Sequence, residues 1–174
     1  MNLRAQILKE HTKANCDIIV NWIGHSQDRF DQLFELFFHG DHRMNQKAAW
    51  PLCNAAVQHP ALIRKHFSKL LGNLQKPGIH DAVKRNSLRL MQDLEIPHRY
   101  HGTLMNYCFD CIMSPSEKVA SKAFALTILD NLSKYYPEIK PELQTVIEER
   151  WNYETAAFHS RAKKILQRMK KAAA

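Results

Sequence analysis

Residues 80–94 read HDAVKRNSLRLMQDL, and this stretch decides the fold. Its apolar residues Val83, Leu90, Met91 and Leu94 recur at the spacing of one face of an α-helix, with the small Ser87 between them. The same pattern returns about one period upstream and one period downstream. Such recurrence indicates a small protein built from helical repeats.

The repeat is also visible in the helices that precede this pattern. Four apolar residues recur after shifts of 37, 37 and 39 positions, and only the last residue of the last set breaks the pattern. The sets are Phe30, Leu33, Phe34 and Phe37; Phe67, Leu70, Leu71 and Leu74; Leu104, Tyr107, Cys108 and Cys111; and Leu143, Val146, Ile147 and Arg150. Because one hairpin cannot bury its apolar face alone, neighbouring hairpins must stack.

Proline, glycine and capping residues divide the chain into helices. We expect Gly24 to end the first helix, and Ser26 and Ser116 to cap later ones. The expected helices cover residues 3–22, 27–38, 43–58, 61–74, 79–95, 98–113, 117–135, 142–151 and 155–171. No segment shows the alternation of a β-strand. The predicted fold is therefore all-α, an α-α superhelix of about four hairpins behind a capping helix.

We expect a single domain over residues 1–174. Its predicted parts are a capping helix at 1–24 and helical hairpins at 26–59, 60–96, 97–136 and 137–171.

The stretch Asp81–Leu94 resembles the second helix of a HEAT repeat, in which a turn aspartate precedes Val-Arg and spaced Ala and Leu. Val119, Ala123, Leu126 and Leu132 repeat this signature more loosely. The resemblance covers about residues 27–171 and implies a solenoid of the HEAT and ARM kind.

Residues 47–50 and the run from 108 to 165 are also similar to a family of short bacterial HEAT-like proteins without a settled function. Some of its members carry an adenylosuccinate lyase label. We reject that activity, because the chain lacks the Ser-Ser-x-Met-Pro-x-Lys-x-Asn loop of those lyases and is too short for their helical bundle.

The chain is basic, with a net charge of +8, but the charge is concentrated. Six cations and no acid lie between Arg161 and Lys171, and the rest of the chain carries 19 cations against 17 acids. No apolar run approaches the roughly 20 residues that cross a bilayer, and no signal peptide is recognisable. Four cysteines are too sparse for a disulfide scaffold. These features predict a cytoplasmic protein.

Two clusters combine residue types that bind metals. One joins two histidines to a Cys-x-x-Cys pair, and the other surrounds a turn; they are His98, His101, Cys108 and Cys111, and His39, Asp41 and His42. The cysteines occupy repeat positions that hold phenylalanine or leucine elsewhere, so we favour a packing role for them. Turn and capping roles are favoured for the second cluster. We predict no metal and no cofactor.

The tryptophans Trp22, Trp50 and Trp151 are expected to pack between helices, and an aromatic platform in a concave groove is the alternative.

One cation recurs in each predicted second helix, at spacings of 38, 37 and 39 residues: Lys47, Arg85, Lys122 and Arg161. Equivalent positions of a solenoid line up along one face, so these residues, with Arg89 and Lys164, form the predicted binding face. Pairing of the cations with acids between repeats is the competing interpretation.

No catalytic motif is present, so the primary prediction is a non-enzymatic scaffold that presents its second-helix face to a protein partner. The alternative is a nucleic-acid-binding module that uses the cation ladder and the basic C-terminal helix, distantly like the HEAT-like DNA glycosylases. An enzyme or metal protein that uses Cys108 and Cys111 is the third hypothesis. The partner and the oligomeric state are not predictable from these residues.

Overall fold

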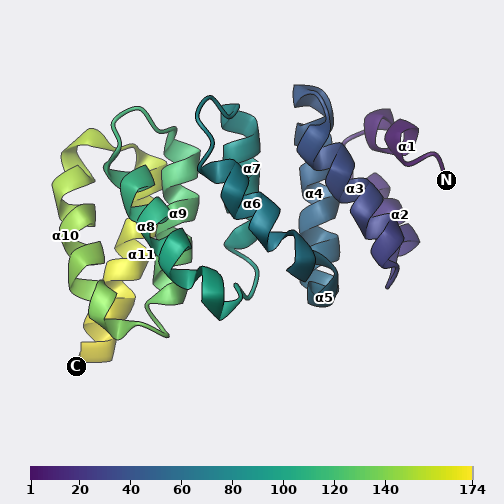
Figure 1. Ribbon diagram of the computed structural model, residues 1–174. Helices are drawn as coiled ribbons and strands as arrows, with labels where there is room; N and C mark the ends of the chain where they lie inside the picture. The colour runs from purple at the N-terminus through teal and green to yellow at the C-terminus, as the bar shows by residue number, and fades with distance from the viewer. Residues whose placement is uncertain (174) are drawn as a thin grey trace. The chain divides into compact units, whose positions relative to one another are not determined.

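The computed structural model describes residues 1–173, with side chains up to residue 171, and these residues form helices and no strand (Figure 1). The prediction of an all-α fold is confirmed. The chain divides into two compact units, Met1–Glu95 and a second unit that begins at Ile96. The single domain predicted over the whole chain stays a prediction.

The first unit contains seven α-helices and one short 3-10 segment, Arg64–His66. The α-helices are α1 (Leu3–Lys9), α2 (Lys13–Ile23), α3 (Gln27–His39), α4 (His42–Gln58), α5 (Pro60–Ile63), α6 (Phe67–Leu74) and α7 (Asp81–Met91). Helix α3 pairs with α4, and α6 pairs with α7, as the repeat predicts. Helices α2, α4 and α7 pack side by side in one row, which is the row of second helices.

The single helix predicted over residues 3–22 is wrong. The chain breaks at Glu10–Thr12, where Thr12 caps α2 by accepting a hydrogen bond from the backbone N–H of Asn15 at 3.2 Å. The buried Asn15 amide then donates to the carbonyls of Gln6 and Glu10, so the break is held by its own polar bonds. Because no glycine or proline marks this break, the apolar pattern alone did not reveal it.

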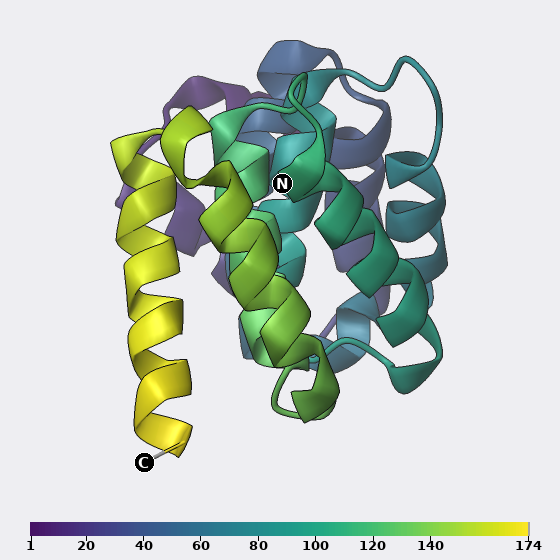
Figure 2. The same cartoon turned by 90° about the vertical axis from the view of Figure 1, so that its left-hand side faces the viewer.

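The second unit contains α8 (His101–Met113), α9 (Val119–Leu132), α10 (Lys140–Arg150) and α11 (Ala156–Ala173). Three 3-10 segments precede α8, α10 and α11: His98–Tyr100, Pro137–Ile139 and Trp151–Tyr153. Helix α9 packs against both α8 and α11, and α10 packs against α8. Figure 2 shows the helices of this unit after a 90° turn of the view, with α11 in yellow.

The helix ends agree only in part with the capping residues predicted from the sequence. Ser26 accepts from the N–H of Arg29 and caps α3, and Gly24 ends α2 with a positive φ of 48°. Ser116 does not cap the next helix, which corrects the prediction. Helix α9 begins later, after Lys118, and the Ser116 hydroxyl bonds to Ser114 instead.

Each unit has a core made of the predicted repeat residues. The fully buried side chains include Phe30, Phe34, Phe37 and Phe67 in the first unit and Leu104, Cys108 and Ile147 in the second. Apolar burial of roughly 1.5–3 kcal/mol per large side chain is therefore what holds the hairpins against one another.

Candidate functional site

The cation ladder of the sequence lies in the first two turns of α4, α7, α9 and α11, but most of its members are not surface charges. Lys47 on α4 is half-buried, and its Nζ donates to the carbonyl of Leu8 at 2.9 Å. This bond closes the C-terminal end of α1 against α4. Lys47 therefore acts as a brace between two helices of the first unit.

Lys122 is not on an accessible face, which corrects its place in the predicted binding surface. Its side chain is 3% exposed, and its Nζ lies 2.5 Å from Oε1 of Glu154, in the connection between α10 and α11. Arg150 donates to the same carboxylate. Burial raises the pKa of Glu154, but the hydrogen bonds from Lys122 and Arg150 outweigh it, so the net shift of this pKa is downward.

The side chain of Arg161 also makes its contacts within the second unit. Its guanidinium donates to the Thr127 hydroxyl at 2.5 Å and to the Ala123 carbonyl at 3.2 Å, and it lies over the ring of Phe124. These contacts tie α11 to α9. Lys164, one turn further along α11, is exposed.

The remaining predicted cations lie on α7 of the first unit, where Arg85 is half-buried and Arg89 is exposed. These two residues share a face of α7, because they are four residues apart. Of the six predicted residues, Arg89 lines a groove, and Lys47 lines a much smaller hollow beside α1 and α2.

That groove lies between α4 and α7 and has a volume of about 620 Å³. It is lined by Trp50, Cys53, Asn54, Val57, Gln58, Arg89 and Asp93. Val57 is 51% exposed, a large value for an apolar side chain, and Trp50 is half-buried. We define these seven residues as the α4/α7 groove.

Polar bonds of the α4/α7 seam lie at its other end, away from the groove. Near the start of both helices, the buried Asn86 amide donates to Oδ1 of Asn45 at 2.8 Å, and Asn45 donates to the Phe37 carbonyl. The neighbouring seam between α2 and α4 is closed where the groove is open, by a 3.4 Å contact from Asn54 to the sulfur of Cys16. The sequence did not reveal these buried asparagines.

The groove carries two opposite charges that are not paired with each other. Arg89 and Asp93 are both exposed and one helical turn apart, yet they form no ion pair within the described residues. Asp93 accepts only a long bond of 3.3 Å from Gln92. Both charges are therefore available to a ligand.

Cys53 forms part of the groove floor and is unsuited to nucleophilic chemistry. Burial raises its pKa to about 12, against an opposing effect of Arg89, so the thiol is protonated at neutral pH. Cys16, on the adjacent helix, has its pKa raised to about 11, first by burial and then by Asp17. The groove therefore contains no activated thiol.

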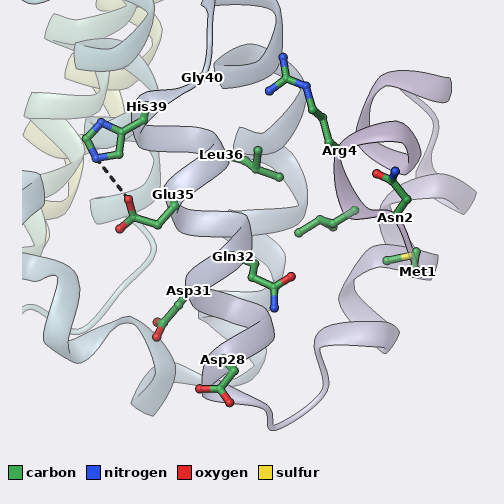
Figure 3. Close-up of a pocket in the computed structure, with 11 residues that line it drawn as sticks. Met1, Asn2, Arg4, Asp28, Asp31, Gln32, Glu35, Leu36, His39 and Gly40 are labelled. Carbon is green, nitrogen blue, oxygen red and sulfur yellow. Dashed lines mark ion pairs between the residues drawn. The ribbon is translucent and has the colours of Figure 1, made fainter.

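A second hollow of the first unit lies between α1 and α3 and has a volume of about 850 Å³ (Figure 3). Its lining includes the carboxylates Asp28, Asp31 and Glu35. Two of these three are already engaged by cations: Asp31 bonds to Lys65, and Glu35 bonds to Lys69 at 2.9 Å. Figure 3 also shows the ion pair between His39 and Glu35.

Asp31 and Glu35 in this hollow are stabilised as anions by their own neighbours. Burial raises the pKa of Asp31, but hydrogen bonds from Lys65, Gln27 and His66 lower it further than burial raises it. The hydrogen bond from Lys69 is the main reason why the pKa of Glu35 is also lowered. Burial lowers the pKa of His66, which stacks on Phe34. Because cations already pair with two of its three carboxylates, this hollow is a weaker binding candidate than the α4/α7 groove.

The residues of the first predicted metal cluster have other partners. Cys108 and Cys111 are buried in α8, and burial raises the pKa of Cys108 well above its usual range. His98 and His101 both bond to the hydroxyl of Tyr136, at 2.9 and 3.1 Å.

The second cluster is also divided. His39 pairs with Glu35, Asp41 caps α4 through the N–H of Met44, and His42 lies against the ring of His80. Among the described residues, no group of three or more His, Cys, Asp or Glu side chains is placed to hold a metal ion.

Comparison with known proteins identifies the fold family. A model of the HEAT repeat domain matches residues 3–169, which is nearly the whole chain. The chain belongs to the HEAT repeat family. No curated protein and no solved structure matches the sequence. HEAT repeats are helical scaffolds, and the paired helices of both units agree with this assignment. None of the described helices is long and apolar enough to cross a membrane.

Proposed function

We propose that this HEAT repeat protein is a non-enzymatic scaffold that binds a protein partner in the α4/α7 groove. The observation that carries the proposal is that the groove combines an exposed apolar side chain, Val57, with two exposed charges, Arg89 and Asp93. These two charges form no ion pair with each other. Tryptophan and arginine are the residues that most often dominate the energy of protein interfaces, and the groove contains one of each.

The partner that fits this groove is an amphipathic helix. A groove between two packed helices accepts the side-chain ridge of a third helix. The ligand would place an apolar side chain against Val57 and Trp50, an acid near Arg89 and a base near Asp93. Such complementarity sets orientation and the association rate more than raw affinity.

The nucleic-acid alternative is not supported by the cation ladder. Lys47, Lys122 and Arg161 use their charges inside the protein, so they do not form a track for phosphates. As part of the proposal, we place the protein in a reducing compartment such as the cytoplasm. The four free cysteines support this location.

Affinity capture with matched surface variants tests the proposal. The groove variants are Val57→Asp and Arg89→Glu, and the control is Ile18→Asp on α2, whose side chain is also 51% exposed. We expect at least one protein to be retained by the wild type and by the control and lost with both groove variants. It must then bind the purified protein directly, with at least tenfold weaker affinity for Val57→Asp. If every retained protein is indifferent to the groove variants, the proposal is wrong.

A further inference from the structure

The connection between α10 and α11 in the second unit exposes aromatic rings beside cations. Tyr153 is 77% exposed, the highest value among the large apolar and aromatic side chains of the described residues. The guanidinium of Arg150 lies over its ring at 5.3 Å, which leaves the opposite face of the ring to solvent. The open face of the Tyr153 ring is therefore accessible to a planar group that stacks on it.

A second ring lies two residues earlier. The half-buried Trp151 stacks on His159 with a centroid distance of 4.2 Å and an interplanar angle of 18°. The Nε2–H of His159 donates to the Trp151 carbonyl at 2.8 Å, which fixes the 3-10 segment against the first turn of α11. The Nζ of Lys163 lies 6.0 Å from the centre of the indole. The two rings are therefore held in place by α10 and α11.

The cations continue along α11 from this point. Lys163 is four residues after His159, and Lys170 is seven residues after Lys163, so the three lie on one face of the helix. Both lysines are exposed. We define the aromatic–basic patch as Arg150, Trp151, Tyr153, His159, Lys163 and Lys170.

Free carboxylates are scarce around this patch. Glu154, which lies within it in sequence, is buried and neutralised by Lys122 and Arg150. No acid occurs from residue 155 to 171. The nearest exposed acids in the sequence are Glu148 and Glu149 of α10, and Glu148 accepts a hydrogen bond from Gln144. The patch therefore combines the exposed ring of Tyr153 with a row of cations that have no acidic neighbour on their own helix.

We propose that the aromatic–basic patch binds single-stranded nucleic acid. Unstacked bases bind to aromatic faces irrespective of sequence, and cations spaced along a helix bind the phosphates that connect the bases. In duplex DNA the bases are already stacked and paired, so Tyr153 has no face to contact. The site is separate from the α4/α7 groove, and its ligand is of a different class.

Fluorescence anisotropy with a labelled oligothymidylate tests the proposal on the full chain, with a duplex of equal length and inorganic polyphosphate as competitors. We expect binding that weakens with salt and that prefers the single strand over the duplex. Tyr153→Ala should weaken oligonucleotide binding about fivefold or more, the lower limit for one stacked base, and leave polyphosphate competition unchanged. Tyr135→Ala is the matched control, because Tyr135 is 64% exposed in the same unit.

A second pair of variants tests the cations. The double variant Lys163→Glu and Lys170→Glu should weaken both ligands and lower the slope of log affinity against log salt by about 1.4, or roughly 0.7 for each lost phosphate contact. The control is Lys9→Glu with Lys13→Glu, which changes the net charge equally in the first unit. Val57→Asp should have no effect, which separates this proposal from the groove.

Four results would overturn the proposal. They are no binding at low salt, equal effects of Tyr153→Ala and Tyr135→Ala, equal effects of the two double lysine variants, or a preference for polyphosphate over the oligonucleotide, which would show a charged patch that makes no contact with bases. Retained circular dichroism of each variant excludes unfolding as the cause.

Discussion

The buried ion pair between Lys122 and Glu154 gives the most specific stability prediction. Among the described residues, the side chain of Lys122 has one partner, Oε1 of Glu154, whereas this carboxylate also accepts two hydrogen bonds from Arg150, at 2.8 and 3.2 Å. Both side chains of the Lys122–Glu154 pair are 3% exposed. Removing one member of this pair should therefore not cost the same as removing the other.

Glu154→Gln leaves a buried ammonium without a carboxylate, so we expect a loss of about 3–5 kcal/mol of unfolding free energy. Lys122→Met keeps most of the side-chain volume and leaves Glu154 paired with Arg150, so we expect a loss of about 1–2 kcal/mol. Arg168→Met is the control: its pair with Asp130 is 57% exposed on the arginine side and should contribute less than about 1 kcal/mol.

Urea unfolding followed by tryptophan fluorescence measures these differences. In a Trp22→Phe, Trp50→Phe background, Trp151 alone reports the second unit. Because the pKa of Glu154 is lower in the folded state, its contribution is present at neutral pH and is lost as the pH falls through the folded value. The gap between wild type and Glu154→Gln should narrow in acid. A Lys122→Met variant that is at least as unstable as Glu154→Gln would refute the reasoning.

Three further outcomes are expected. Gly40→Ala should destabilise the first unit by more than about 1 kcal/mol in thermal unfolding, because the new Cβ would lie 2.3 Å from the carbonyl oxygen of Leu36. The control Gly72→Ala adds a Cβ that meets nothing within 4 Å, so it should stabilise α6 by about 0.5–1 kcal/mol in the same measurement. Asp31→Asn should remove part of the loss of stability in acid, because the folded pKa of Asp31 is lowered and its contribution disappears as the pH falls through that value; melting temperatures at neutral and acid pH measure this. The four cysteines are buried, so a thiol reagent should react with the native protein far more slowly than with the protein in urea.

The apolar spacing was sufficient to predict the hairpins, because the burial of Phe30, Phe34 or Leu71 depends on position within a helix and little else. Polar and charged residues were harder. The period placed Lys122 correctly within α9, but whether its ammonium meets water or Glu154 depends on a connection 32 residues away. A repeat period defines which residues are equivalent, and it carries no information about their partners.

The same limit explains why Val57 and Asp93 were not predicted as site residues. Val57 has no charge and belongs to no motif. The only sequence feature that points to its exposure is its position close to the polar Asn54 and Gln58 of the same helix. Arg89 was predicted from its charge, and it is the member of the predicted face that lines the groove. Exposure of an apolar side chain is a property of packing, and no single-residue rule gives it.

The groove itself follows from a repeat that is not copied faithfully. At the seam between α2 and α4, Asn54 contacts Cys16 and Trp50 lies against His11. One period later, Cys53 replaces Cys16 and Gln92 replaces Asn54, but Gln92 bonds to Asp93, its own neighbour on the chain.

Leu88 stands where Trp50 stood, and it is fully buried, so it does not cover the surface as Trp50 does. Arg85 replaces Lys47 and forms no hydrogen bond or ion pair with the described residues. The seam between α4 and α7 therefore differs from the earlier one at positions 85, 88 and 92, and Arg89, Asp93 and Val57 lie at the edges of its groove. A bulky side chain at position 93, which lines the groove, would fill it from its edge. Asp93→Trp should consequently abolish partner binding while leaving α7 helical, and retained binding would show that the partner does not enter between these two helices.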